Sequence, residues 1–386
     1  MSYTLAADSW GEDEARAIID TLSSRRYTMG PRVRQFEDEF AKYVGSRNAV
    51  MTNSGSSANL VALSAVFHRY ALDMFDEVIV PAVSWSTTYF PIHQLGLKMV
   101  FVDVDDTFNM DPTALQEAIT PRTRAVMMVN LLGNAANLSL VREVCDERGL
   151  LLIEDNCESL GALSDTGRQA GTVGDCGTFS FFFSHHMQTM EGGMVVTDDD
   201  ILADYMRSVR AHGWVRDLRT NALYEKSGDD FEDSFKFVLP GYCVRPLEMS
   251  AAVGSVQLRR LDEFLKNRRD NAAHFLRVLS ECGGRLTPQA CDPGRSSWFG
   301  FGVILPEGVD RREVVKSLRY HGVETRPIVS GNFVNQPVMH MIDHRVHGRL
   351  TVAEAIDKRG LFIGNDHRDL RSDISRAVRV MGGFNA

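Results

Sequence analysis

The sequence lacks several features that would each point to a particular class of protein. No apolar run approaches the roughly 20 residues that a transmembrane helix needs. The first residues contain no basic segment followed by an apolar one, so we expect no signal peptide. Basic residues are not in excess, because the net charge over 386 residues is −9. We therefore expect a cytoplasmic protein that binds neither a membrane nor nucleic acid.

Closely spaced cysteines are also missing. The six cysteines stand at positions 145, 157, 176, 243, 282 and 291, and no two of them form a Cys-x-x-Cys pair. Iron–sulfur clusters and structural zinc sites need compact sets of cysteine ligands. Nothing else in the sequence indicates secretion, so we expect reduced thiols and no metal site.

What the sequence does contain is typical of an α/β enzyme. Hydrophobic residues make up 44% of the chain and charged residues 24%. Short apolar runs bounded by turn residues occur at residues 78–81, 100–103, 126–129 and 150–153. Runs that are apolar on both faces fit buried parallel strands, and the helical pattern of residues 111–118 lies between two of them. We expect a mostly parallel sheet covered on both sides, with ligands bound beyond the carboxyl ends of its strands.

The pattern changes in the second half of the chain. Residues 246–279 read as one or two long amphipathic helices, followed by a strand at 298–305 and a helix at 311–320. The polar residues 220–233 are the best candidate for a mobile surface loop. We predict three parts, which are an N-terminal arm (1–12), a large α/β domain (13–254) and a smaller C-terminal α+β domain (255–386).

Three segments carry residues that suit a flat, phosphorylated cofactor. Gly55 and Ser56 lie in a glycine–serine turn that opens a helix, which is either a phosphate site or an ordinary serine cap. Asp155 follows an apolar strand and can bind a protonated ring nitrogen or cap a helix. Trp85 follows another strand and can stack on a ring or fill the core. Each of these signals is weak alone.

The most informative stretch is residues 177–193, which contains Phe179-Ser180-Phe181 and ends in Glu191-Gly192-Gly193. It resembles the cofactor-lysine segment of the pyridoxal-phosphate-dependent nucleotide-sugar aminotransferase (DegT/DnrJ/EryC-type) family. In that pattern, the lysine position is occupied by His185. An imidazole transfers protons near neutral pH but cannot form the stable Schiff base that a lysine amine forms.

The resemblance extends over nearly the whole chain, including residues 80–89, 129–134, 211–214, 232–242 and 326–333. It implies an aspartate-aminotransferase-like fold (fold type I), the cofactor pyridoxal 5′-phosphate or pyridoxamine 5′-phosphate, and a homodimer with shared active sites. It also implies roles for nine residues. It implies that Gly55, Ser56 and Ser180 bind the cofactor phosphate and that Trp85, Asp155 and Glu158 contact its ring. It further implies that His185 is the acid–base group and that Arg245 or Arg326 binds a carboxylate or phosphate of the substrates.

One position departs from the family pattern. Cys243 follows Gly241-Tyr242, where the family commonly has an asparagine that reaches the phosphate in the neighbouring subunit's site. A thiol is a poor hydrogen-bond donor, so we expect this contact to be lost or replaced by water.

The histidine variant of the motif resembles the 3-dehydratase branch of the family. That likeness implies removal of the C3 hydroxyl from a GDP-linked 4-keto-6-deoxymannose, with L-glutamate as amino donor. We expect His185 to have a pKa suited to protonating the leaving hydroxyl. The alternatives are a nucleotide-sugar 4-aminotransferase, the same deoxygenation on another nucleotide sugar, an iron–sulfur-assisted 3-dehydratase, and a noncatalytic cofactor sensor.

Overall fold

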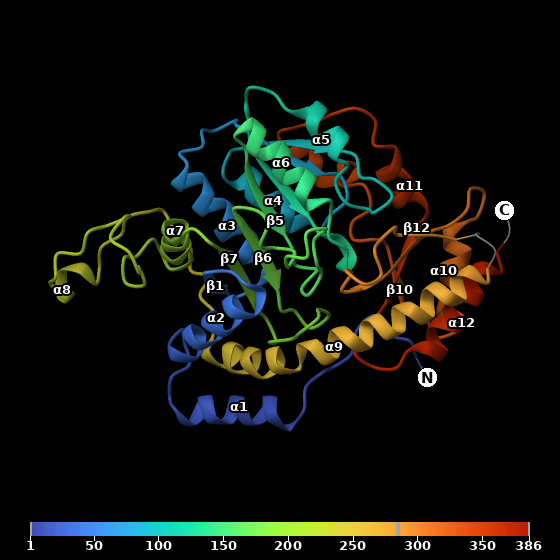
Figure 1. Cartoon of the computed structure of the whole chain (residues 1–386), viewed down its shortest axis with the longest axis horizontal. Coiled ribbons are helices and arrows are strands. Elements are labelled where there is room, and N and C mark those ends of the chain that lie inside the picture. Colours follow the sequence, from blue (N-terminus) through green and yellow to red (C-terminus); the bar gives the residue numbers. More distant parts are fainter. Residues whose placement is uncertain (1, 283–285, 385–386) are drawn as a thin grey trace.

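Two β-sheets organise the chain in the computed structural model, which describes residues 2–282 and 286–384 (Figure 1). The larger sheet has eight strands in the order β1-β7-β6-β5-β4-β2-β3-β11. Their bounds are β1 Asn48–Thr52, β2 Glu77–Pro81, β3 Lys98–Val102, β4 Thr123–Val129, β5 Leu151–Asp155, β6 Cys176–Ser180, β7 Gly193–Thr197 and β11 His344–Val346. Among these strands, only β7 is antiparallel to its neighbours, and the other paired strands are parallel.

The four strands expected from the apolar runs are confirmed as β2, β3, β4 and β5. Their side chains alternate between two cores, as the period of a strand requires. Val78 and Val80 pack on one face of the sheet, whereas Ile79 packs on the other. Both faces are buried, which explains why the runs are apolar without alternation.

Helices cover both faces of the large sheet. One face packs against α3 Gly55–Arg69, α4 Ser86–Gln94, α7 Asp200–Arg210 and α11 Thr351–Arg359. The other packs against α2 Pro31–Val44, α5 Pro112–Ala118, α6 Leu138–Arg148 and the first half of α9 Glu248–Ser280. The expected helix at 111–118 is present as α5, and the Asp111 side chain caps it by accepting from the Thr113 N–H. The fold class predicted from the sequence is confirmed.

The smaller sheet is antiparallel and has the order β10-β12-β9-β8. Its strands are β8 Thr287–Pro288, β9 Gly300–Ile304, β10 Thr325–Arg326 and β12 Gly360–Gly364. It shares a core with α10 Arg311–Tyr320, α12 Arg371–Gly382 and the second half of α9. The remaining helices are α1 Glu12–Ser23, α8 Asp230–Asp233 and the short 3₁₀ helices η1 Leu131–Gly133, η2 Phe333–Asn335 and η3 Pro337–Met341.

Helix α9 joins the two parts of the molecule. It is a single helix of 33 residues that passes through the predicted domain boundary at residue 255. Figure 1 shows it running along one side of the molecule, beside α1 and α2 at one end and α12 at the other. Strand β11 returns from the C-terminal part to the edge of the large sheet. The three-part division stays a prediction, and its residues 1, 283–285 and 385–386 lie outside the described residues.

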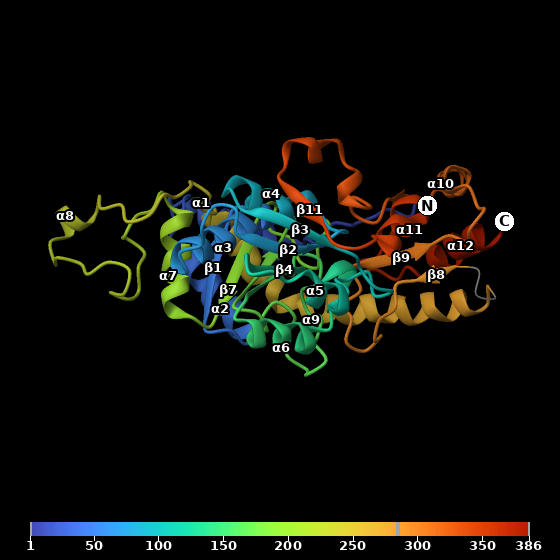
Figure 2. The same ribbon diagram turned by 90° about the horizontal axis from the view of Figure 1, so that it is seen from above.

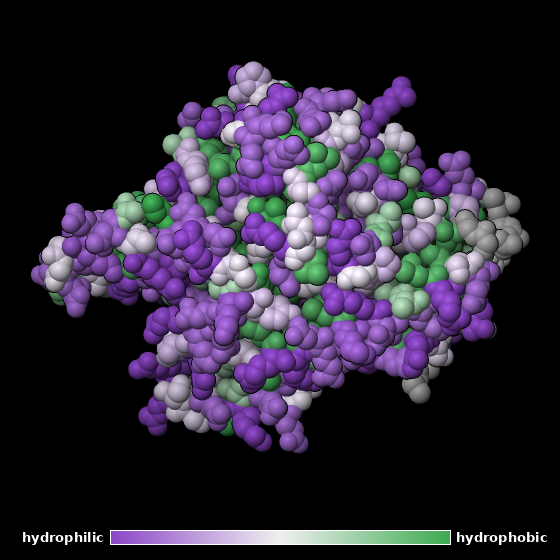
Figure 3. Space-filling view, in the orientation of Figure 1, coloured by the Kyte–Doolittle hydropathy of each residue, from purple (hydrophilic) through white to green (hydrophobic). Residues whose placement is uncertain are grey.

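The segment of residues 217–240, which includes α8, projects from the body in both ribbon views (Figures 1 and 2). Phe231 and Phe235 on this segment are 83% and 65% exposed. On the face shown in Figure 3, apolar groups form small separate patches among hydrophilic residues, and the projecting lobe carries one of them. The segment lies at the surface as expected, and its mobility stays a prediction.

Gly254 allows α9 to lie against α2. A Cβ atom at this position would lie 2.6 Å from Cζ of Phe36, which is fully buried among other aromatic rings. No real Cβ tolerates such a distance, so the close contact between the two helices requires glycine.

We therefore expect Gly254→Ala to destabilise the protein by about 1–3 kcal/mol through overpacking. This result is opposite to the usual gain of about 0.5–1 kcal/mol when alanine replaces glycine inside a helix. Urea unfolding measures the difference. The control is Gly294→Ala, where the added Cβ makes an ordinary 3.4 Å contact with Asp292 at the surface. A Gly254→Ala protein as stable as the parent would contradict the packing account.

Candidate active site

A cavity of about 410 Å³ lies at the carboxyl edge of the large sheet, where that edge meets the smaller sheet. Eight of the nine residues singled out from the sequence line it. They are Gly55, Ser56, Trp85, Asp155, Glu158, Ser180, His185 and Arg326. No lysine is among its lining residues in the described part of the chain.

The first turn of α3 forms one wall of the cavity. The Ser54 side chain caps the helix by accepting from the Ser57 N–H at 3.1 Å. The N–H groups of Gly55 and Ser56 have no acceptor within the helix, and the helix dipole makes this end positive. A Cβ on Gly55 would lie 2.5 Å from Cβ of Ser180, so glycine is required for the approach of β6. The wall combines free N–H donors with the Ser56 and Ser180 hydroxyls and suits a phosphate group.

Asp155 ends β5 and is held by three donors. Its Oδ2 accepts from Asn59 Nδ2 at 2.8 Å and from Thr88 Oγ1 at 2.7 Å, and its Oδ1 accepts from the Cys157 N–H at 3.2 Å. These bonds fix the orientation of the carboxylate at the cavity wall. Trp85 lies at the N-cap of α4, 57% exposed, with its ring free to stack on a ligand.

Sequence reasoning missed the two side chains that orient Asp155. Asn59 follows Gly55 by one helical turn on an otherwise apolar face of α3, and Thr88 stands one turn after Trp85 on α4. A buried polar residue one turn after a ligand-binding position is a signal that could have indicated both. Neither is apparent until the two helices are placed beside β5.

His185 lies on the loop between β6 and β7. Its backbone N–H donates to the Phe182 carbonyl oxygen at 2.9 Å, and its ring packs edge to face against the Phe299 ring, with 5.2 Å between the two centroids. Nδ1 is buried without a hydrogen-bond partner in the described structure. Burial, and then the charges of Arg326 and Arg268, lower the pKa of His185 to about 3. The expected near-neutral pKa is therefore wrong for the protein alone, in which the imidazole is an uncharged base at neutral pH.

Two further side chains give the cavity both signs of charge. Glu158 Oε2 accepts from the Leu132 N–H at 3.2 Å, and burial raises the pKa of this carboxyl group above its usual value. The Arg326 guanidinium lies 4.7 Å from the centroid of the Phe362 ring, and its Nε is buried without a hydrogen-bond partner in the described residues. Arg326 is therefore available to an anionic ligand.

Arg245 is the one predicted site residue that the structure does not bring to the cavity. Its guanidinium lies 5.6 Å from the centroid of the Trp214 ring, and its Nη2 is 3.4 Å from Cys243 Sγ. Neither Arg245 nor Cys243 lines the cavity in the described chain.

The described residues contain no group of three or more histidine, cysteine, aspartate or glutamate side chains that could hold a metal ion. All six cysteines are free thiols. None of the described helices is both long and apolar enough to cross a bilayer.

Comparisons with known proteins point to one family. The sequence pattern of the DegT/DnrJ/EryC1/StrS aminotransferase family matches residues 8–379. GDP-4-keto-6-deoxy-D-mannose 3-dehydratase from Yersinia pseudotuberculosis is 47% identical over 99% of this chain and 98% of its own length.

Two solved structures are similar in fold and sequence. GDP-4-keto-6-deoxymannose-3-dehydratase with a trapped PLP–glutamate geminal diamine has a TM-score of 0.94 and 46% identity, covering 98% of this chain and 100% of the other. A histidine-to-asparagine variant of that enzyme with bound GDP-perosamine has the same TM-score of 0.94 and identity of 46%, and the same coverage of 98% and 100%.

We expect the imidazole of His185 to remain uncharged throughout the range from about pH 5 to 8, in which an ordinary histidine titrates. The physical reason is that burial and two nearby guanidinium groups disfavour its cationic form. Histidine-labelled NMR spectra of the cofactor-free protein measure this, and His185→Asn assigns the signal. A midpoint near 6.5 would show that the ring is more hydrated than its surroundings indicate.

Proposed function

The chain belongs to the DegT/DnrJ/EryC1/StrS aminotransferase family, and from that premise we propose that it removes the C3 hydroxyl of GDP-4-keto-6-deoxy-D-mannose. The product is GDP-4-keto-3,6-dideoxymannose. The observation that carries this proposal is that His185, and no lysine among the described lining residues, lies in a cavity whose lining suits a phosphorylated ring. The 47% identity to a 3-dehydratase over nearly the full chain supports the same reaction.

Loss of the C3 oxygen is a two-electron reduction of the sugar, so an electron donor is required. L-Glutamate fills that role, as the PLP–glutamate adduct of a similar enzyme suggests. The overall reaction is then nucleotide sugar plus glutamate giving dideoxy sugar, 2-oxoglutarate and ammonia. The water formed from the leaving hydroxyl balances the water consumed when ammonia is released.

The cavity residues fit pyridoxal 5′-phosphate or pyridoxamine 5′-phosphate. When bound, this cofactor would supply an amine for the 4-keto carbon and a ring that stabilises the electron pair left on its deprotonated methylene, and that pair would expel the C3 hydroxyl. Gly55, Ser56 and Ser180 would hold its phosphate, and Trp85 would stack on its ring. Asp155 would bind the ring nitrogen, Glu158 would lie beside the ring, and Arg326 would bind an anionic group of the cofactor or the substrate.

His185 both accepts and donates the proton in this proposal. Because the protein holds its ring uncharged, a nitrogen of the imidazole can remove a proton from the cofactor methylene. The imidazolium formed in that step is a strong acid in a site that disfavours the cation, and it returns the proton to the departing C3 hydroxyl. One residue thus performs both transfers without a second titrating group.

The other functions are less well supported. A 4-aminotransferase needs an amine nucleophile, which none of the described residues lining the cavity provides. A noncatalytic sensor has no need of a base next to the ring position. The GDP group and the sugar configuration follow from the similar enzymes alone, so the same deoxygenation on another nucleotide sugar is the main alternative.

The active form in this proposal is a cytoplasmic homodimer with shared sites. Arg245 and Cys243 lie away from the cavity of their own chain, in agreement with contacts across a subunit interface. Large exposed apolar side chains support the same association. They are Trp85 and Phe182 at the cavity and Phe231, Phe235 and Phe237 on the projecting segment.

The direct test is to incubate the purified protein with pyridoxamine phosphate, glutamate and GDP-4-keto-6-deoxymannose, and to follow product mass and ammonia. We expect a product that has lost one oxygen, with one ammonia released for each sugar converted. His185→Asn removes the base while keeping a side chain of similar size, and should reduce turnover by about 10²–10⁴-fold.

An amino sugar as product would instead establish an aminotransferase. Deoxygenation of a different nucleotide sugar, with no reaction of the GDP-linked one, would keep the reaction but change the substrate. Binding of the cofactor without turnover of any keto sugar would favour the sensor.

Asp155→Asn tests the cofactor site separately from the chemistry. Loss of a charged acceptor for the ring N–H reduces the binding free energy of the cofactor by about 1.5–3 kcal/mol. We therefore expect the Kd for pyridoxal phosphate to rise roughly 10–100-fold. An absorbance titration measures it. Asp111→Asn is the control, because Asp111 caps α5 away from the cavity and asparagine is an equally good cap. Equal affinities of the two variants would contradict the assigned role of Asp155.

A further inference from the structure

Arg268 is a buried cation directly behind the cavity. It lies on α9 and is 3% exposed. Its Nη1 donates to the carbonyl oxygens of Trp298, Phe299 and Asn365 at 3.4, 3.2 and 2.6 Å, and its Nη2 donates to the carbonyl oxygen of His185 at 3.3 Å. Burial lowers the pKa of Arg268 to about 10, so it keeps its charge at neutral pH. All four of these acceptors are backbone carbonyls.

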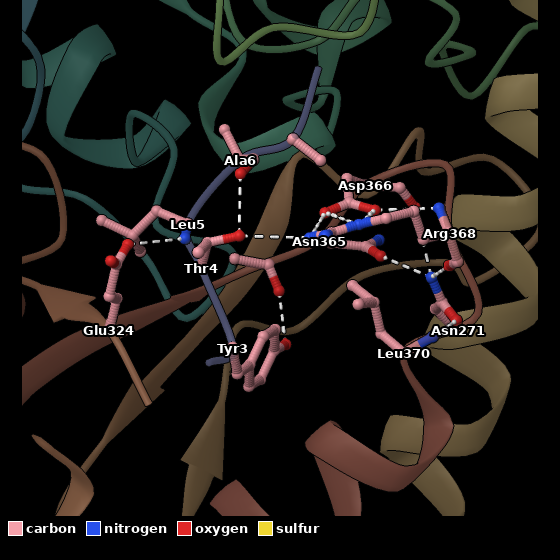
Figure 4. A network of polar contacts seen from close by, with 12 residues as sticks. Tyr3, Thr4, Leu5, Ala6, Asn271, Glu324, Asn365, Asp366, Arg368 and Leu370 are labelled. Atoms are coloured by element: carbon pink, nitrogen blue, oxygen red, sulfur yellow. Dashed lines mark hydrogen bonds and ion pairs between the residues drawn. The ribbon is translucent and has the colours of Figure 1, made fainter. Parts of the chain in front are cut away.

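These acceptors come from three separate segments, which are the loop that carries His185, the residues that enter β9, and the residue that follows β12. Asn365 strengthens the junction, because its Nδ2 donates to the Trp298 and Arg268 carbonyl oxygens at 2.9 and 3.2 Å. Figure 4 shows how the network continues through Asn271 and the Asp366–Arg368 pair to Thr4 of the N-terminal segment. The guanidinium of Arg268 is where this network meets the cavity loop.

We propose that Arg268 is a positioning residue for His185, fixing the backbone of the imidazole-bearing loop against the small sheet and placing a positive charge behind the ring. This inference rests on the proposed function, because it assumes that His185 is the acid–base group. A guanidinium with a planar array of donors is suited to bind several carbonyl oxygens at once, which an ammonium group on a flexible stem does less well.

The charge of Arg268 acts on His185 among other nearby groups. Among the described residues, the cationic or titratable side chains around His185 are Arg268 from α9, Arg326 from β10, the adjacent His186, and His367 after β12. The acidic ones around the same space are Asp155, Glu158, Glu191 and Asp366. Burial and the two guanidinium groups dominate for His185, so loss of the Arg268 charge favours protonation of the ring. His186 does not replace His185, because its Nε2 already pairs with the Ser297 carbonyl oxygen at 3.2 Å.

The neighbouring Arg269 provides a matched control. It also joins backbone carbonyls of separate segments, with Nε to Ser296 at 3.2 Å and Nη2 to Gly161 at 3.1 Å. It makes no bond to His185 in the described structure. Substitutions at Arg269 therefore measure how much stability is lost when an arginine of α9 no longer binds backbone carbonyl oxygens.

The experiment compares Arg268→Met, Arg268→Lys, Arg269→Met and Arg269→Lys with the parent. The readouts are the NMR titration of His185 in the cofactor-free and cofactor-loaded protein, Tm, and kcat and KM. We expect Arg268→Met to raise the titration midpoint of His185 by about one pH unit through loss of the charge. Arg268→Lys keeps the midpoint, because it keeps the charge, but lowers kcat about 10-fold or more with little change in KM, because His185 is misplaced. The Arg269 variants change Tm alone.

If Arg268→Lys folds and its kcat equals that of the parent, the positioning role is overturned. This test holds even if Arg268→Met fails to fold. Equal effects of the Arg268 and Arg269 variants on every readout also overturn it, since the role is then only structural. The titration and Tm need no turnover. If the parent does not convert the sugar, the proposed function fails, and an unchanged His185 midpoint in Arg268→Met would separately refute the charge effect.

Discussion

The close contact between the first turn of α3 and the ends of β6 and β7 is the constraint on which the rest of the site depends. A Cβ on Gly55 would lie 2.5 Å from Ser180 Cβ, and one on Gly193 would lie 2.3 Å from the Ser54 carbonyl oxygen. These two glycines bring the N–H donors of a helix end against the loop that carries His185. Because parallel strands end at one edge, Asp155 and Trp85 reach the same cavity, and the proposed positions of the phosphate, the ring and the base are fixed together.

In the proposed function, the side chain at position 185 determines which reaction is possible. A lysine there would be both a base and an amine that forms a Schiff base, whereas an imidazole can act as a base but forms no stable Schiff base. The protein buries this ring beside two guanidinium groups, which disfavour the imidazolium and keep the imidazole uncharged in the cofactor-free protein.

Much of the fold could be predicted from local sequence, because the buried strands β2 to β5 are apolar on both faces and the cap of α5 is an aspartate followed by proline. The candidate site residues, including Ser180 and His185, came from the resemblance to the family. Long-range packing was not predictable. Strand β11 joins the large sheet from the C-terminal part, and α9 stays helical across residue 255 because both halves are buried by different cores. The donors to Asp155, the low pKa of His185 and the role proposed for Arg268 all depend on segments that are distant in sequence.

The central claim is that the cavity holds its cofactor without a covalent bond to the chain. The most direct measurement is to treat the pyridoxal-phosphate-loaded protein with borohydride, denature it and determine the intact mass. The account predicts the mass of the unmodified chain, with all cofactor released. A chain that carries one reduced cofactor on a lysine would contradict it, because an amine would then reach the ring and the preference for elimination would lose its physical basis.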